Sequence, residues 1–226
     1  MVLVQPRKMV LEQRSVSMPV PDEILVAVRA CAQCGSDLHG YLGRHSRVHP
    51  PRVLGHELAG EVVAVGRSIH GVEVGLRCCV ENHIPCGRCE YCVIVRPNLC
   101  TASESIGFTR DGAYAQFVLA PGHCIIPLPE EVSFSVGAVM QTMGVAFHAV
   151  HDVAEVHLND WVGIQGAGPI GLCALAVAKA AGAFVVQFDA VDYRLDAAKN
   201  GGGRHCECFQ GRPFGAGGRA YAGAWS

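Results

Sequence analysis

A cysteine, four histidines and several oxygen-bearing side chains lie close together within residues 34–57. Thiolate sulfur and imidazole nitrogen are ligands that zinc prefers, and a catalytic zinc takes three protein ligands and keeps one position open for water or substrate. Cys34 and His56 are candidates for two of these ligands. Ser36 and His39 follow Cys34 closely and could handle a proton beside a metal. Taken alone, the pattern is equally compatible with a cysteine packed in a core and histidines on a surface loop.

Four further cysteines follow the spacing Cys-x2-Cys-x2-Cys-x7-Cys, at Cys86, Cys89, Cys92 and Cys100. Four thiolates in one short loop can enclose a tetrahedral zinc and leave no coordination position open, which is typical of a structural site. The loop has few apolar residues of its own to pack, so metal binding would supply much of its folding free energy. An iron–sulfur cluster also takes four thiolates and is the competing interpretation. Zinc is favoured because the neighbouring motifs fit hydride transfer without an electron-transfer partner.

A glycine pattern, Gly-x-Gly-x-x-Gly, lies between a predicted apolar strand and a predicted helix. Its glycines allow a tight turn and a close approach to a pyrophosphate, which the helix N-terminus faces. Asp189 ends the next predicted strand, where a carboxylate bonds to ribose hydroxyls and repels a 2′-phosphate, so NAD is favoured over NADP. Asp192 is the second choice for this acid, and a turn that binds no nucleotide is the alternative. The turn residues expected to contact the cofactor are Gly166, Gly168, Pro169, Ile170 and Gly171.

The composition indicates a folded chain without an acidic or basic bias. Half of the 226 residues are hydrophobic and the net charge is −2, which argues against nucleic acid and anionic membrane surfaces as partners. The chain opens without a secretory signal pattern, so a cytoplasmic location is expected. Twelve cysteines then fit metal sites and free thiols better than disulfides. The most apolar window, 161–188, contains glycines and changes periodicity, which predicts strand, turn and helix and not a membrane span.

The elements that must position these groups follow two sequence patterns, a β-rich one up to residue 129 and one with helices after it. Short β-rich runs bounded by glycine and proline extend to residue 129, and residues 34–39 should form a loop or short helical turn at a strand end. Residues 133–151 favour helix, with Ser133 and Ser135 as candidate N-caps. The expected strands are 23–30, 58–66, 75–80, 114–119, 124–129, 161–164 and 184–188, and the later helices are 172–181 and 193–199.

With these motifs in this order, the chain resembles the zinc-dependent medium-chain alcohol dehydrogenases, in particular the polyol and threonine dehydrogenase branch. The resemblance implies a β-rich GroES-like barrel domain (1–142, with a structural zinc lobe at 83–101) and an α/β Rossmann domain (143–200) that is C-terminally incomplete. It implies one catalytic and one structural Zn²⁺, NAD as cofactor and a small-molecule alcohol as substrate. The implied reaction transfers a hydride between a secondary alcohol or polyol and NAD.

The same resemblance implies roles for the residues of the first cluster. Zinc would hold the alcohol oxygen and lower its pKa, while Ser36 and His39 relay the proton outward through the cofactor ribose. Asp37 and Glu57 would orient the ligands. Alignment on the family pattern puts Gln141 at the third zinc ligand, where an amide oxygen brings no charge. Either Gln141 or Glu57 would complete the site, and we expect weaker retention of this zinc than with a carboxylate at position 141.

The chain departs from the family pattern after Lys199. A full dinucleotide fold needs two βαβαβ halves, but no apolar strand is predicted beyond this point and the Gly/Ala-rich tail 201–226 is expected to be disordered. Cys206-x-Cys208 is interpreted as a chance pair. A truncated, catalytically inactive zinc-binding fragment is therefore the alternative function, and the homo-oligomer implied by the family is less expected for this chain. A zinc-free quinone reductase is disfavoured because it would lack both metal clusters.

Overall fold

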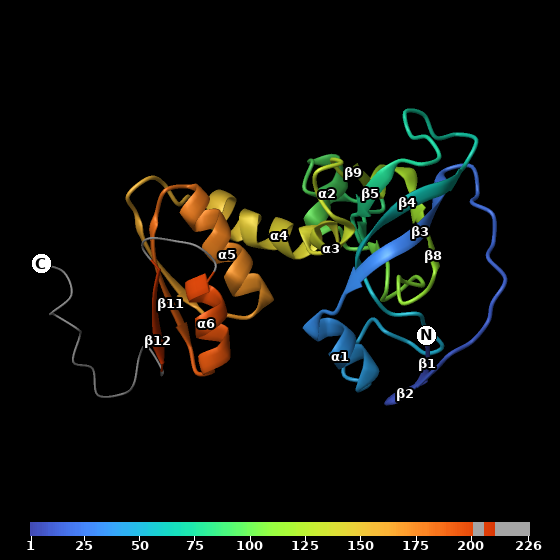
Figure 1. Ribbon diagram of the computed structural model, residues 1–226. Coiled ribbons are helices and arrows are strands. Elements are labelled where there is room, and N and C mark those ends of the chain that lie inside the picture. Colours follow the sequence, from blue (N-terminus) through green and yellow to red (C-terminus); the bar gives the residue numbers. More distant parts are fainter. Residues whose placement is uncertain (201–205, 211–226) are drawn as a thin grey trace, which may run out of the picture. The chain divides into compact units, whose positions relative to one another are not determined.

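The computed structural model describes residues 1–200 and the backbone of strand Cys206–Gln210 (Figure 1). The chain divides into two compact units, the first ending at Gln141 and the second beginning at Thr142. This division falls one residue before the boundary expected from the change in pattern. No helix among the described residues is both long and apolar enough to cross a membrane. The tail 201–226 was expected to be disordered, but residues 206–210 form a strand. The rest of the tail and the side chains of Cys206 and Cys208 lie outside the described residues.

The first unit is built around a five-stranded antiparallel sheet in the order β8-β3-β4-β5-β9. The first four residues of β3 are all buried, and Ile24 and Val26 are completely so, which places both faces of this part of the strand inside the unit. Gly60 lies where a Cβ would come 2.2 Å from the Ala27 carbonyl oxygen, so the close approach of β3 and β4 requires glycine. The strands are β3 Glu23–Ala32, β4 Glu57–Val65, β5 Arg77–Val80, β8 Phe117–Pro121 and β9 Ile125–Pro127.

Two short antiparallel pairs and several short helices complete this unit. The pairs are β1 Val2–Gln5 with β2 Lys8–Val10, and β6 His83–Ile84 with β7 Glu104–Ser105. Ser133 caps α3, since its Oγ accepts a hydrogen bond from Val136 N at 3.3 Å, whereas Ser135 lies inside the helix and is not a cap. The helices are α1 Gly35–Tyr41, α2 Glu90–Val93, η1 Pro97–Leu99, η2 Gly122–Cys124 and α3 Phe134–Gly137.

Adjacent cysteines on β5 show how the sheet separates two cores. Cys78 is fully buried in the main cluster, whereas Cys79 packs with Ala59 and Leu128 in a smaller cluster. Successive side chains of a strand point to opposite faces, so neither cysteine is available to a metal. Both cysteines therefore pack inside the sheet.

The second unit contains a parallel sheet in the order β10-β11-β12. Its core joins the helices to the sheet through Leu175, Val185 and Leu195. The expectation that no strand follows Lys199 is wrong, because pairing with β11 stabilises β12 where the local sequence shows no apolar pattern. The helix α4 Met140–Phe147 begins two residues before the boundary between the units. The elements that follow are the π-helix η3 His148–Val153, β10 Trp161–Gln165, α5 Pro169–Ala180, β11 Phe184–Asp189, α6 Asp192–Asn200 and β12 Cys206–Gln210.

Candidate metal centres and dinucleotide turn

The antiparallel pairing of β3 and β4 brings the first cluster together. Ala32 at the end of β3 lies opposite Glu57 at the start of β4. Cys34 follows β3 as the N-cap residue of α1, and His56 directly precedes β4. One ligand atom from each of Cys34, His56 and Glu57 lies within 4.8 Å of the other two. The imidazole and carboxylate residues are buried, with 3% and 6% exposure, and the cysteine is half-buried.

The carboxylate of Asp37 holds this cluster from one side. Its Oδ2 accepts hydrogen bonds from Cys34 N at 3.0 Å and from the hydroxyl of Tyr114 at 3.1 Å. Its Oδ1 accepts one from Gly55 N at 3.1 Å and lies 3.4 Å from Nδ1 of His56. A carboxylate that orients an imidazole in this way is the usual support of a metal-binding histidine.

The charges of the cluster suit a cation. The imidazole of His56 lowers the pKa of Cys34. Burial alone would lower the pKa of His56, but its contacts with Asp37 and Cys34 outweigh burial and raise the pKa to about 9. Burial likewise would raise the pKa of Asp37, but His56 and the N–H of Cys34 outweigh it and the pKa is lowered. A thiolate, an imidazole and a carboxylate form the donor set of a catalytic zinc, which displaces the protons as it binds.

The remaining predicted residues of this site are placed as follows. Ser36 Oγ, in the first turn of α1, is buried and has no hydrogen-bond partner among the described residues. His39 lies three residues further along α1 and is exposed, and no hydrogen bond joins it to Ser36 in the described chain. Gln141 lies in the first turn of α4 and is half-buried. The proton relay and the ligand role of Gln141 therefore stay predictions.

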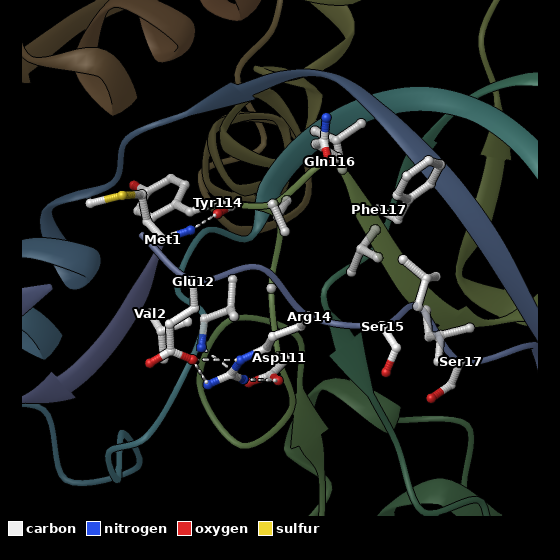
Figure 2. A pocket seen from close by; sticks show the side chains of 18 of the residues that line it. Met1, Val2, Glu12, Arg14, Ser15, Ser17, Asp111, Tyr114, Gln116 and Phe117 are labelled. Carbon is white, nitrogen blue, oxygen red and sulfur yellow. Dashed lines mark hydrogen bonds and ion pairs between the residues drawn. The ribbon is translucent and has the colours of Figure 1, made fainter. Parts of the chain in front are cut away.

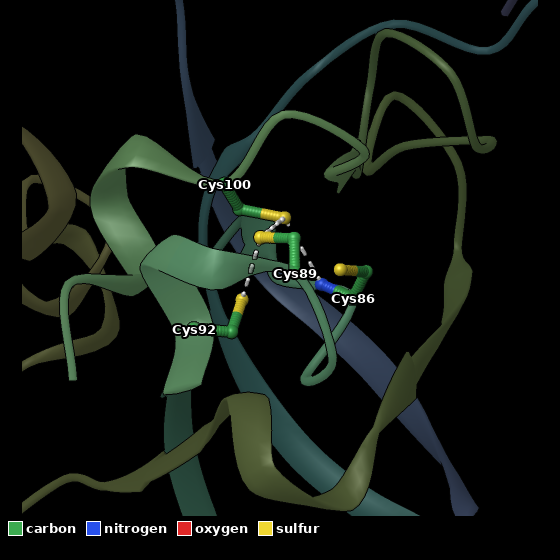
Figure 3. A group of neighbouring side chains, drawn as sticks. All are labelled: Cys86, Cys89, Cys92 and Cys100. Atoms are coloured by element: carbon green, nitrogen blue, oxygen red, sulfur yellow. Dashed lines mark hydrogen bonds between the residues drawn. The ribbon is translucent and has the colours of Figure 1, made fainter. Parts of the chain in front are cut away.

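The four cysteines of the predicted lobe converge on one point (Figure 3). Cys89 Sγ lies 3.6 Å from the sulfur of Cys92 and 3.8 Å from that of Cys100, and all four sulfurs lie within 4.8 Å of one another. Tetrahedral zinc with Zn–S bonds of about 2.3 Å requires sulfurs roughly 3.8 Å apart. The geometry therefore fits one closed tetrahedral ion.

The ionisation of these thiols also favours a bound cation. Backbone N–H groups of Cys92 and Thr101 lower the pKa of Cys89 to about 6. Burial and the contact with Cys89 raise the pKa of Cys92 to about 12, because neighbouring thiols resist joint ionisation. A metal ion removes that resistance by compensating all the thiolates. Gly87 has φ of 72°, a left-handed conformation that allows a tight turn among the four cysteines.

The glycine pattern forms a turn between β10 and α5. Gly166 has φ of 97°, in the left-handed region, and Gly168 is the N-cap residue of α5. A Cβ on Gly171 would lie 1.9 Å from the Gly166 carbonyl oxygen, so the turn and the helix touch there. A Cβ on Gly168 would meet nothing within 4 Å, so space is open in front of the helix N-terminus. This is the arrangement in which a helix N-terminus binds a pyrophosphate.

The predicted acid lies beside this turn. Asp189 Oδ2 accepts a hydrogen bond from Ala167 N at 2.7 Å, and Oδ1 accepts one from Val191 N at 2.9 Å. These backbone groups, the Ala167 N–H first, lower the pKa of Asp189, so the side chain is a carboxylate. Asp192 begins α6, beyond the end of β11. Of the two candidates, Asp189 is therefore the acid that contacts the turn.

Sequence reasoning missed two supporting side chains. Gln187 is fully buried in β11, and its Nε2 donates a hydrogen bond to the Gly166 carbonyl at 2.8 Å. Gln187 could have been recognised from the sequence, because a polar residue at an inward position of an apolar strand needs a hydrogen-bond partner. Tyr114, which bonds to Asp37, is 77 residues away from it in the chain and carried no local signal.

A cavity of about 1200 Å³ lies elsewhere in the first unit, between residues 11–17 and 110–119 (Figure 2). Arg14 beside it is paired with Glu12 at 2.8 Å and lies 3.7 Å from a carboxylate oxygen of Asp111, so its charge is compensated. None of the candidate zinc ligands lines this cavity. It is therefore separate from both metal clusters, and we assign it no role.

Comparisons with known proteins agree with this arrangement. Residues 20–130 match the family described as alcohol dehydrogenase GroES-like domain. The L-threonine 3-dehydrogenase of Protochlamydia amoebophila is 35% identical over 199 residues, which cover 84% of this chain and 57% of that protein. The enzyme of the same name from Pyrococcus horikoshii is 37% identical over 196 residues, covering 85% and 56%. The chain thus spans a little over half the length of these relatives.

Solved structures show the same architecture. Galactitol-1-phosphate dehydrogenase from Escherichia coli is 29% identical with a TM-score of 0.84, covering 92% of this chain and 60% of that one. A protein from Sinorhizobium meliloti 1021 solved with NADP bound is 31% identical with a TM-score of 0.87, covering 92% and 60%. The predicted GroES-like β domain and Rossmann α/β unit are confirmed. Residues 20–130 therefore belong to the alcohol dehydrogenase GroES-like domain family, and the chain as a whole is similar to zinc-binding and NAD-dependent dehydrogenases of known structure.

Proposed function

We propose that this chain carries the zinc site of an oxidoreductase that transfers a hydride between a secondary alcohol or polyol and NAD. The observation that carries the proposal is the convergence of Cys34, His56 and Glu57 within 4.8 Å, next to the orienting carboxylate of Asp37. A zinc ion held there would supply Lewis acidity at the alcohol oxygen. The names of the relatives support the substrate class, since the hydroxyl of threonine is a secondary alcohol and galactitol is a polyol.

In this proposal Glu57 is the third protein ligand, and Gln141 is the alternative. Glu57 is supported because its carboxylate lies with the cysteine and the histidine in one group. Ser36 would take the proton that the substrate hydroxyl loses while its own hydroxyl proton passes on toward His39, which would release it to solvent. This relay is supported by the buried, unpartnered Oγ of Ser36 and by the exposure of His39 on the same helix.

We further propose two zinc ions per chain and NAD as the cofactor. The second zinc binds the four cysteines and is structural, because four thiolates leave no open position. NAD is supported by Asp189, whose negative charge beside the turn disfavours a 2′-phosphate. A small-molecule alcohol partner and a cytoplasmic location belong to the same proposal, whereas the homo-oligomer suggested by the family is less expected for this chain.

The test is reduction of NAD by purified protein of confirmed zinc content, with a panel of secondary alcohols and polyols that includes L-threonine. We expect turnover with at least one member of the panel and cofactor binding by calorimetry. Zinc binding without any turnover or cofactor binding would contradict the proposal and support the alternative, a catalytically inactive zinc-binding fragment.

Mild chelation is expected to remove one zinc ion and leave the other. The Cys34 site has three candidate protein ligands and an open position that a chelator can enter, whereas the four-cysteine site is closed. Zinc content measured by elemental analysis after stepwise treatment should therefore pass through a plateau at one ion per chain. Two ions that both resist mild chelation would contradict the weak retention expected here.

Replacing Gly171 with alanine is expected to abolish dinucleotide binding and to destabilise the second unit. The new Cβ would lie 1.9 Å from a backbone oxygen that has little freedom to move. Gly168→Ala is the matched control, because its Cβ would contact no other atom of the protein within 4 Å. This Cβ would clash only with a bound pyrophosphate, so it should weaken cofactor binding without changing stability. Calorimetry with NAD should show no binding to Gly171→Ala and weakened binding to Gly168→Ala. Thermal melts should show a lower melting temperature for Gly171→Ala only. Equal stability of the two variants would contradict this account.

A further inference from the structure

Three segments of the first unit meet at the carboxylate of Asp37. One is the start of α1, through Cys34 N, and another is the loop before β4, through Gly55 N. The third is the loop before β8, from which the hydroxyl of Tyr114 donates to Oδ2 at 3.1 Å. Asp37 is only 5% exposed, so water does not readily replace a lost partner.

The position of Tyr114 is set by its own loop. Its backbone N–H donates to Leu54 O at 2.9 Å, and Ala113 N donates to Gly55 O at 2.8 Å. Its ring lies against Gly55, where a Cβ would come 2.6 Å from ring atom Cδ1. The tyrosine is thereby tied to the segment that leads directly into His56, and its hydroxyl reaches the carboxylate from a fixed direction.

Each carboxylate oxygen of Asp37 contacts a different candidate zinc ligand. Oδ1 lies near the imidazole of His56, and Oδ2 accepts from the backbone of Cys34. If the Tyr114 hydroxyl were absent, Oδ2 would keep one of its two hydrogen bonds, and the carboxylate would be freer to rotate away from His56. Partners that orient metal ligands in this way affect metal affinity although they never touch the ion.

We infer that Tyr114 is a positioning residue of the Cys34–His56 metal centre, acting through the carboxylate of Asp37. The inference rests on the proposed catalytic zinc site, and it adds to that site a residue from a distant part of the chain. Tyr114 acts on zinc binding through orientation of the ligands and has no contact with the reacting atoms.

The test is Tyr114→Phe, which removes one oxygen and keeps the ring that packs on Gly55. We expect zinc at the Cys34 site to bind about 10-fold more weakly, and the absorption spectrum of cobalt substituted there to change. Tyr41→Phe is the matched control, because the Tyr41 hydroxyl donates to Arg7 O at 2.9 Å and does not bond to Asp37. The four-cysteine site provides an internal reference, since its zinc should be retained in both variants.

A double-mutant cycle shows whether Tyr114 acts through Asp37. If it does, Tyr114→Phe should add little to the loss of zinc affinity caused by Asp37→Asn. Zinc affinity of Tyr114→Phe within twofold of the unchanged protein would overturn the inference while leaving the proposed function intact. Loss of both zinc ions, or equal weakening in Tyr41→Phe, would show a general structural effect and also overturn it. An unchanged protein that binds zinc only at the four cysteines would overturn the proposed function together with the inference.

Discussion

Cys92→Ser is expected to release one zinc ion per chain and to lower the melting temperature by about 10 °C or more. The sulfur of Cys92 lies 3.6 Å from that of Cys89 in a group that fits one tetrahedral ion. A serine oxygen cannot replace the thiolate, so the remaining three sulfurs form an open and weaker site. The energy of metal binding then no longer contributes to folding, which amounts to several kcal/mol.

The lobe has little else to hold it. Three consecutive residues next to Cys92 are 61% to 84% exposed and belong to no described core cluster, namely Val93, Ile94 and Val95. The loop therefore depends on its metal in the way that small zinc domains do. Calorimetric melting with zinc analysis checks the expectation, and a melting temperature within about 2 °C of the unchanged protein would contradict a structural role.

The motifs were readable from the sequence because their chemistry is local. The four cysteines fall within 15 residues, and the glycine turn is framed by its own strand and helix. Both patterns appear in the structure where the sequence predicts them. For the residues after β3 a loop or a short helical turn was expected, and the structure has the short helix α1.

Features that depend on tertiary pairing were not readable. The contact between Cys34 and His56 requires that Ala32 pair with Glu57. The sequence of the two strands does not by itself specify this pairing register. The bond from Tyr114 to Asp37 likewise joins residues far apart in the chain. Strand β12 was missed because its pairing with β11, and not an apolar pattern, defines it.

The helical region that contains the boundary between the two units shows a third limit. Residues 133–151 have a helix-favouring composition throughout, and no break in the helix is predicted. The structure instead contains α3, α4 and the π-helix η3, with Val139 between the first two outside any helix. Composition reports helix propensity, but the breaks depend on packing against the rest of the chain.

Cys34→Ser is expected to remove the other zinc ion and to reduce turnover by about 10³-fold or more. Loss of the thiolate leaves an imidazole and a carboxylate, which are too few to hold the ion that would polarise the alcohol oxygen. That polarisation is worth several kcal/mol in the transition state, and about 4 kcal/mol corresponds to 10³-fold in rate. Zinc analysis should fall from two ions to one, with the four-cysteine ion retained.

The melting temperature separates this effect from that of Cys92→Ser. The segments around Cys34 are held without metal by the pairing of β3 with β4 and by the hydrogen bonds of Asp37. The Cys34→Ser protein should therefore melt much closer to the unchanged protein than Cys92→Ser does.

Cys31→Ser is the matched control for Cys34→Ser. Cys31 is also half-buried, lies three residues earlier, and donates from Sγ to Ala32 O at 3.5 Å, a bond that a serine hydroxyl can keep. Burial raises its pKa to about 12, and its sulfur is not among the ligand atoms that converge at the Cys34 site. This variant should keep both zinc ions and its turnover. If Cys34→Ser retained both ions, or if Cys31→Ser lost one, the catalytic zinc would not be bound where these residues converge.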